Sequence, residues 1–182
     1  MDIFLLRHGE AADLGGKIKS DAARPLTDEG IKLMNDEAEG IKRLGLRFNA
    51  ILTSPLIRAK ETAQIVADVL DCSRKLHVCE ALGMPVSIPD LMEAFKPFQN
   101  DYRILLVGHM PDMGKLAGHF IGNNKFILPF KKGSLAKIEV DLASIDGALA
   151  RNATTAEALE DRRRQLAGWG LRHRVDELRR RV

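Results

Sequence analysis

The chain lacks the features of membrane, secreted and metal-binding proteins. Its 182 residues include only two cysteines, Cys72 and Cys79, which are too few for a disulfide framework or for a metal site with enough ligands. No segment approaches the roughly 18 uncharged apolar residues that a membrane span requires. The first apolar run, 3–6, is too short for a signal peptide, and the residue before it is acidic. We therefore expect a cytoplasmic protein with no membrane partner and no bound metal.

What the chain does contain is the composition of one globular domain. The hydrophobic fraction is 45% and the charged fraction 29%, which excludes disordered and low-complexity proteins. The net charge of +3 is uneven, because residues 151–182 carry +4, with nine arginines and five acids, whereas the first 150 residues carry −1. This nearly neutral body predicts no nucleic-acid partner. We predict an α/β domain over 1–146, with 147–182 as its Arg-rich, mostly helical C-terminal extension. The sequence leaves the oligomeric state open, with a monomer favoured.

Apolar runs alternate with amphipathic segments along the first 140 residues, which predicts strands alternating with helices. Thr27 has the features of a helix N-cap, and Gly45 has those of a helix stop. The helix between them has an apolar stripe made of Ile31, Met34, Ala38, Ile41 and Leu44. Strands separated by helices imply a three-layer α/β sandwich with a mostly parallel central sheet and helices on both faces. The expected strands are 2–7, 50–53, 76–79, 103–108 and 134–140, and the expected helices are 28–44, 56–70, 89–95 and 112–121.

Three polar segments occupy equivalent places, each at the end of an expected strand. Arg7, His8 and Gly9 follow the first strand. Arg58 lies in the first turn of the helix after the second strand, and His109 follows the fourth strand. Ligands of open α/β sheets bind outside the carboxyl ends of the strands, so we expect these segments to meet in one cleft.

The side chains of these segments would make a cationic pocket that is rich in hydrogen-bond donors. Two arginines, two histidines and the N–H groups of the helix that begins after Pro55 suit a tetrahedral phosphate dianion. Gly9 would permit a close approach of the backbone to that anion. Taken singly, each residue also has a structural explanation, since a histidine at a strand end can be a core residue and Arg58 can be a solvated charge. Their combination favours a phosphate site.

Motifs of other phosphate-handling enzymes are absent from the sequence. Neither cysteine is followed six residues later by arginine, so the loop of the cysteine phosphatases is missing. There is no Gly-x4-Gly-Lys-Ser/Thr segment, which argues against a nucleotide-binding kinase. No cluster of aspartate and histidine suggests a two-metal phosphatase.

The same three segments resemble motifs of the histidine phosphatase superfamily. Residues 5–10, Leu-Leu-Arg-His-Gly-Glu, are similar to its signature, 53–63 to its second motif and 107–109 to its third. Residues 24–30, together with the short length, most resemble the SixA-type phosphohistidine phosphatases of that superfamily. The resemblance covers about residues 1–140.

The resemblance implies a role for each motif residue. His8 would be the nucleophile and transient phosphate carrier, forming a phosphoenzyme that water then hydrolyses. Arg7, Arg58 and a protonated His109 would bind the phosphate in place of a metal, and no cofactor is implied. Arg24 would either reach the same pocket or tie its own loop down with a salt bridge.

Two acidic residues are candidates for the proton donor. By its position after the second motif's helix and the following strand, Glu80 is the candidate, with Glu93 as the second choice. A phosphohistidine has a good leaving group, so a weak or distant acid would matter less for it than for an alkyl phosphate. The other histidines, His77, His119 and His173, are interpreted as lying outside the site.

These observations together predict a metal-independent phosphatase that removes phosphate from histidine on a protein. The resemblance supports this substrate, because larger relatives insert segments over the pocket and a core of about 140 residues leaves little room for them. Two alternatives remain open. One is a phosphomonoesterase for a small phosphate ester, and the other is a module that binds phosphate-like anions or phosphoproteins without turnover.

Overall fold

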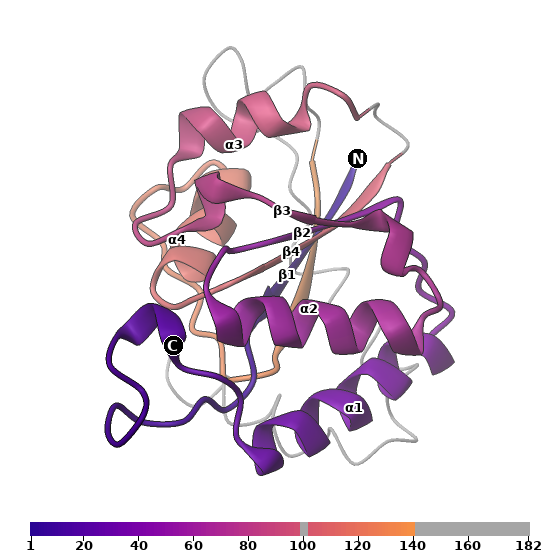
Figure 1. The fold of residues 1–182 in the computed structure, drawn as a ribbon. Helices are drawn as coiled ribbons and strands as arrows, with labels where there is room; N and C mark the ends of the chain where they lie inside the picture. The colour runs from indigo at the N-terminus through magenta and orange to yellow at the C-terminus, as the bar shows by residue number, and fades with distance from the viewer. Residues whose placement is uncertain (99–101, 141–182) are drawn as a thin grey trace, which may run out of the picture.

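The computed structural model describes residues 1–98 and 102–140, and its centre is a five-stranded sheet (Figure 1). The strands are β1 (Asp2–Arg7), β2 (Ala50–Thr53), β3 (Leu76–Val78), β4 (Arg103–Gly108) and β5 (Leu135–Glu139). They lie in the order β3-β2-β4-β1-β5. All neighbours are parallel except β5, which is antiparallel to β1, so the predicted mostly parallel sheet is confirmed.

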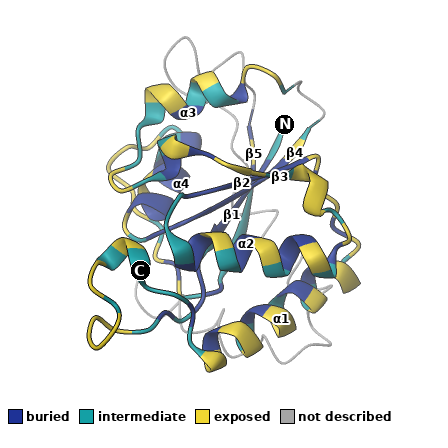
Figure 2. Ribbon diagram, in the orientation of Figure 1, coloured by how far each residue is buried: buried dark blue, intermediate teal, exposed yellow. Residues whose placement is uncertain are grey.

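Helices cover both faces of this sheet, which confirms the predicted three-layer sandwich (Figure 1). Side chains alternate along β1: Ile3 and Leu5 face one helical layer, and Phe4 and Leu6 face the other. The first layer contains α3 (Ile88–Phe95) and α4 (Asp112–Phe120), and the second contains α1 (Asp28–Arg43) and α2 (Ile57–Val69). The sides of these helices that face the sheet are buried and their outer sides are exposed (Figure 2).

The helix α1 shows how local signals in the sequence determine an element and where they fail. Thr27 caps it as predicted, with its side-chain oxygen accepting the N–H of Gly30 at 3.0 Å. Gly45 ends it with a φ of +67°. Ile31 was predicted to face the core, but it is 41% exposed, and Gly30 is buried instead. A Cβ on Gly30 would lie 2.1 Å from the carbonyl oxygen of Glu10, so the glycine lets α1 pack closely against the loop that follows β1.

The remaining differences from the predicted elements are small shifts at their ends, where boundaries are least determined. Short 3-10 turns complete the connections, namely η1 (Asp21–Ala23), η2 (Ser73–Lys75) and η3 (Glu80–Leu82). Within the described ranges no helix is both long and apolar enough to cross a membrane. The predicted extension over 147–182 lies outside the described residues.

Candidate active site

A cavity of about 330 Å³ lies at the carboxyl ends of the central strands. The register of the sheet explains the position, because Arg7 at the end of β1 pairs with Gly108 at the end of β4, and Thr53 of β2 pairs with Val107. The three segments singled out in the sequence therefore meet at this edge. The cavity is lined by Arg7, His8, Ala11, Asp21, Arg24, Arg58, Met84, His109, Met110 and Lys132.

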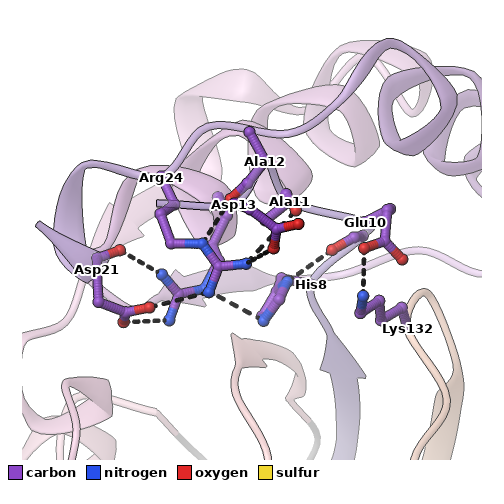
Figure 3. Close-up of polar contacts among 10 residues, drawn as sticks. His8, Glu10, Ala11, Ala12, Asp13, Asp21, Arg24 and Lys132 are labelled. Carbon is purple, nitrogen blue, oxygen red and sulfur yellow. Dashed lines mark hydrogen bonds and ion pairs between the residues drawn. The ribbon is translucent and has the colours of Figure 1, made fainter. Parts of the chain in front are cut away.

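The imidazole of His8 is held in one orientation at this edge (Figure 3). Its Nδ1 lies 2.6 Å from the carbonyl oxygen of Gly9, and a carbonyl only accepts, so Nδ1 carries the ring hydrogen. The other nitrogen, Nε2, accepts the Nε–H of Arg58 at 3.3 Å. Burial lowers the pKa of His8 to about 4, with the charge of Arg58 adding to the shift and the Gly9 hydrogen bond opposing it. At neutral pH Nε2 is therefore unprotonated and carries a lone pair.

Arg58 extends from the first turn of α2 and is only 4% exposed. Each of its three nitrogens donates a hydrogen bond. Nε donates to His8, Nη1 to the main-chain oxygen of Asp21 at 2.7 Å, and Nη2 to the Asp21 carboxylate at 2.9 Å. The guanidinium thus lies between Nε2 of His8 on one side and Asp21 on the other, an arrangement that the sequence did not predict.

His109 is buried at the end of β4, with its ring centroid 5.0 Å from that of His8. Burial and the positive charge of Arg58 lower the pKa of His109 to about 3. The ring is therefore neutral in the resting site, whereas the protonated His109 expected with phosphate bound stays a prediction. In the resting site a third cation, buried beside two arginines, would lose its hydration without gaining a counter-ion, and a bound phosphate would supply that counter-ion.

The hydroxyl of Ser54 contacts one ring nitrogen of His109. The Ser54 hydroxyl oxygen accepts the N–H of Leu56 at 3.3 Å, and in one tautomer of His109 its own hydrogen is donated to His109 Nε2 at 2.8 Å. In that tautomer His109 Nδ1 carries the ring hydrogen. This atom and Arg7 Nε are buried and have no hydrogen-bond partner among the described residues. Both side chains line the cavity, so an anion there would satisfy two otherwise unpaired donors.

The loop between α4 and β5 brings a further cation, Lys132, to the cavity. This loop is tied to the end of β1, because Arg7 Nη1 donates to the carbonyl of Phe130 at 2.7 Å and the N–H of Gly133 donates to the carbonyl of Arg7 at 3.1 Å. The ammonium of Lys132 pairs with the carboxylate of Glu10, the residue that ends the signature segment. Lys132 was not predicted, because no sequence motif marks it.

Gly9 has a packing role that was not expected from the sequence. Its N–H donates to Thr62 Oγ1 at 3.1 Å, and the Thr62 hydroxyl donates to the carbonyl of Arg58 at 2.7 Å. A Cβ at Gly9 would lie 2.7 Å from Met34 Cγ on α1, so the glycine is required for packing. Gly9 is not among the residues that line the cavity, and its predicted contact with the anion stays a prediction.

The remaining candidates fall into two groups. Arg24 lines the cavity and also holds its loop, since its Nε donates to the carbonyl of Ala12 at 2.5 Å. The two carboxylates considered as proton donors, Glu80 and Glu93, are exposed and do not line the cavity, and neither does His119. Within residues 1–98 and 102–140, no group of three histidine, cysteine, aspartate or glutamate side chains is placed to hold a metal ion.

The part of the chain that builds this cavity matches known proteins. Residues 3–83 match the model of the histidine phosphatase superfamily, branch 1. Over 119 residues the chain is 30% identical to the phosphohistidine phosphatase SixA of Escherichia coli, and the match covers 64% of this chain and 71% of SixA. Over 119 residues it is also 35% identical to an uncharacterized protein of Picosynechococcus, covering 64% of this chain and 71% of that protein.

A solved structure agrees with these sequence matches. The protein histidine phosphatase SixA in complex with tungstate aligns with a TM-score of 0.70 and 25% sequence identity, covering 79% of this chain and 90% of that chain. The fold and the family expected from the sequence are thereby confirmed. The chain belongs to the histidine phosphatase superfamily and is one of its phosphatases.

Proposed function

We propose that this phosphatase removes phosphate from phosphohistidine on a protein, with His8 as the nucleophile. The neutral imidazole supports this role, because its Nε2 lone pair lies beside Arg58, a donor that can hold a phosphoryl oxygen. The two unpaired donors of Arg7 and His109 would hold further oxygens of the same group. The tungstate complex of the related SixA supports the binding of phosphate-like anions here as well.

The reaction would proceed in two displacements at phosphorus. In the first, His8 Nε2 attacks, a new P–N bond forms, and the P–N bond of the substrate breaks with its electron pair staying on the departing imidazole. In the second, water attacks the phosphoryl group on His8, that P–N bond breaks, and inorganic phosphate leaves. Throughout, the charge on the phosphoryl oxygens would be stabilised by N–H donors of Arg7, Arg58 and His109.

The single observation that carries the choice of substrate is the state of the acid groups around the cavity. Among the described residues that line it, Asp21 is the only carboxylate. Burial alone would raise the pKa of Asp21, but hydrogen bonds from Arg24 and Arg58 outweigh it and lower the pKa. Asp21 therefore holds no proton to donate at neutral pH.

The absence of a protonated acid among the described lining residues favours a leaving group that does not need one. An alkoxide is a poor leaving group and depends on a positioned general acid. The imidazole of phosphohistidine has a second ring nitrogen, which can take up a proton from solvent before the P–N bond breaks. The name of the E. coli relative, a phosphohistidine phosphatase, supports the same choice.

The test compares kcat/KM on a phosphohistidine protein, para-nitrophenyl phosphate and glycerol phosphate. We expect turnover of the first two, with glycerol phosphate slower by at least about 10²-fold, the smaller end of what a general acid contributes. A preference for glycerol phosphate would contradict the substrate assignment and make the chain a small-molecule phosphatase. His8 as nucleophile would survive that result.

A further inference from the structure

Asp21 lies on the loop that connects β1 to α1, and its side chain lines the cavity (Figure 3). It contacts Arg58 twice, through its main-chain oxygen at 2.7 Å and through its carboxylate at 2.9 Å. The other carboxylate oxygen accepts from Arg24 Nη1 at 3.0 Å. Arg24 in turn is anchored to the main chain of the same loop at Ala12. A continuous series of contacts therefore runs from the loop to the nucleophile His8.

The two contacts from Asp21 determine how the guanidinium of Arg58 is oriented. A guanidinium is a rigid planar fork, so fixing Nη1 and Nη2 also fixes the direction of Nε–H. In this structure Nε–H points at His8 Nε2, the atom that would attack phosphorus. Asp21 binds the Nη1 and Nη2 atoms of Arg58 and thereby determines that the Nε–H on the other side points at His8.

Charge gives a second reason why Asp21 matters to Arg58. The arginine side chain is 4% exposed, and a guanidinium that is buried to this degree requires a counter-ion. The side chain of Asp21 is 45% exposed, so it needs no such partner for its own hydration. The ion pair is therefore needed to stabilise the charge of Arg58 rather than that of Asp21.

We propose that Asp21 is a positioning residue for the phosphatase reaction, holding Arg58 so that its Nε–H edge faces His8 and the phosphoryl group. Asp21 does not contact the phosphoryl group, since two anions would repel each other, and it acts through Arg58 alone. The proposal rests on the roles proposed above for His8 and Arg58.

The first test compares three variants with para-nitrophenyl phosphate as substrate. Asp21→Ala should lower kcat by about 10–100-fold, the loss expected when a group that binds the transition state is misplaced. Asp21→Asn keeps an oxygen that can accept from Arg58 but lacks the counter-charge, so it should recover only part of that loss. Asp13→Ala is the matched control, because Asp13 lies in the same loop and pairs with Arg24 at 3.6 Å but does not line the cavity. It should stay within about twofold of the unmodified enzyme.

The second test separates positioning from a general weakening of the loop. In a double-mutant cycle, Asp21→Ala should lower kcat/KM in the presence of Arg58 but change it less than about twofold in an Arg58→Ala background. Additive losses would overturn the proposal, and so would an Asp13→Ala loss equal to that of Asp21→Ala. A His8→Ala variant that kept its activity would instead refute the proposed function, so the two failures are distinguishable.

Discussion

Lowering the pH should destabilise the fold, because the cavity buries two histidines in their neutral form. The pKa of His8 is lowered to about 4 and that of His109 to about 3, chiefly by burial. In the unfolded chain both would titrate near the ordinary pKa of about 6.5. Between these values the unfolded state binds more protons than the folded state, so stability rises with pH and is lost as the pH falls below about 6.5.

The size of the effect follows from these pKa values. At about pH 5 an unfolded imidazole is mostly protonated, whereas the folded one is not, which costs about 2 kcal/mol for each histidine relative to about pH 8. The two together cost about 4 kcal/mol, which is a large share of the 5–15 kcal/mol of a typical domain. Most carboxylates stay ionised over this range of pH, so they change little.

Urea unfolding at the two pH values measures this loss. The buffers must lack phosphate and sulfate, because an anion bound to the folded state would stabilise it. Replacing His8 and His109 together by asparagine should make the free energy of unfolding less dependent on pH by about 4 kcal/mol. His77→Asn, which changes an exposed histidine of β3, is the control and should follow the unmodified protein. An unchanged pH dependence in the double variant would refute the conclusion that both rings are buried neutral.

Three further predictions concern catalysis. His8→Ala should lower kcat by at least about 10³-fold and abolish an acid-labile, base-stable phosphate label trapped by rapid quench; near-normal turnover would exclude His8 as the nucleophile. Glu80→Gln should leave para-nitrophenyl phosphate hydrolysis within about twofold, since Glu80 is exposed and does not line the cavity; a large loss would restore it as the proton donor. Activity should survive EDTA and be inhibited competitively by tungstate, because N–H donors that line the cavity would hold the anion without a metal. A loss of activity in EDTA that is recovered on adding a divalent ion would contradict this.

The site residues that were predicted from the sequence all lie next to a strand or helix that the local sequence pattern predicts. Arg7, His8 and His109 come directly after apolar runs whose length and pattern predict buried strands. Arg58 lies in the first turn of a helix whose beginning is indicated by Pro55. Because parallel strands end at the same edge of a sheet, predicting the strands was enough to predict that these side chains meet.

The residues that the sequence missed lie in loops, where no periodicity points to a place in space. Asp21 and Lys132 reach the cavity only because their loops fold back toward the end of β1. The neutral resting state of His109 was not predicted for a related reason. Its neutral state depends on burial and on the nearby Arg58, and neither of these can be inferred from the residue type.

Two glycines near the site link the residues that were predicted from the sequence to those that were missed. Gly9 and Gly30 allow α1 to approach the loop after β1, and the N–H of Thr27 closes that loop by donating to the carbonyl of Glu10 at 3.0 Å. The loop that is closed in this way is the one that carries Asp21 and Arg24. Close packing of α1 therefore also determines where the partner of Arg58 lies. A Gly9 substitution would thus be expected to impair catalysis through this packing even if Gly9 never contacts the phosphate.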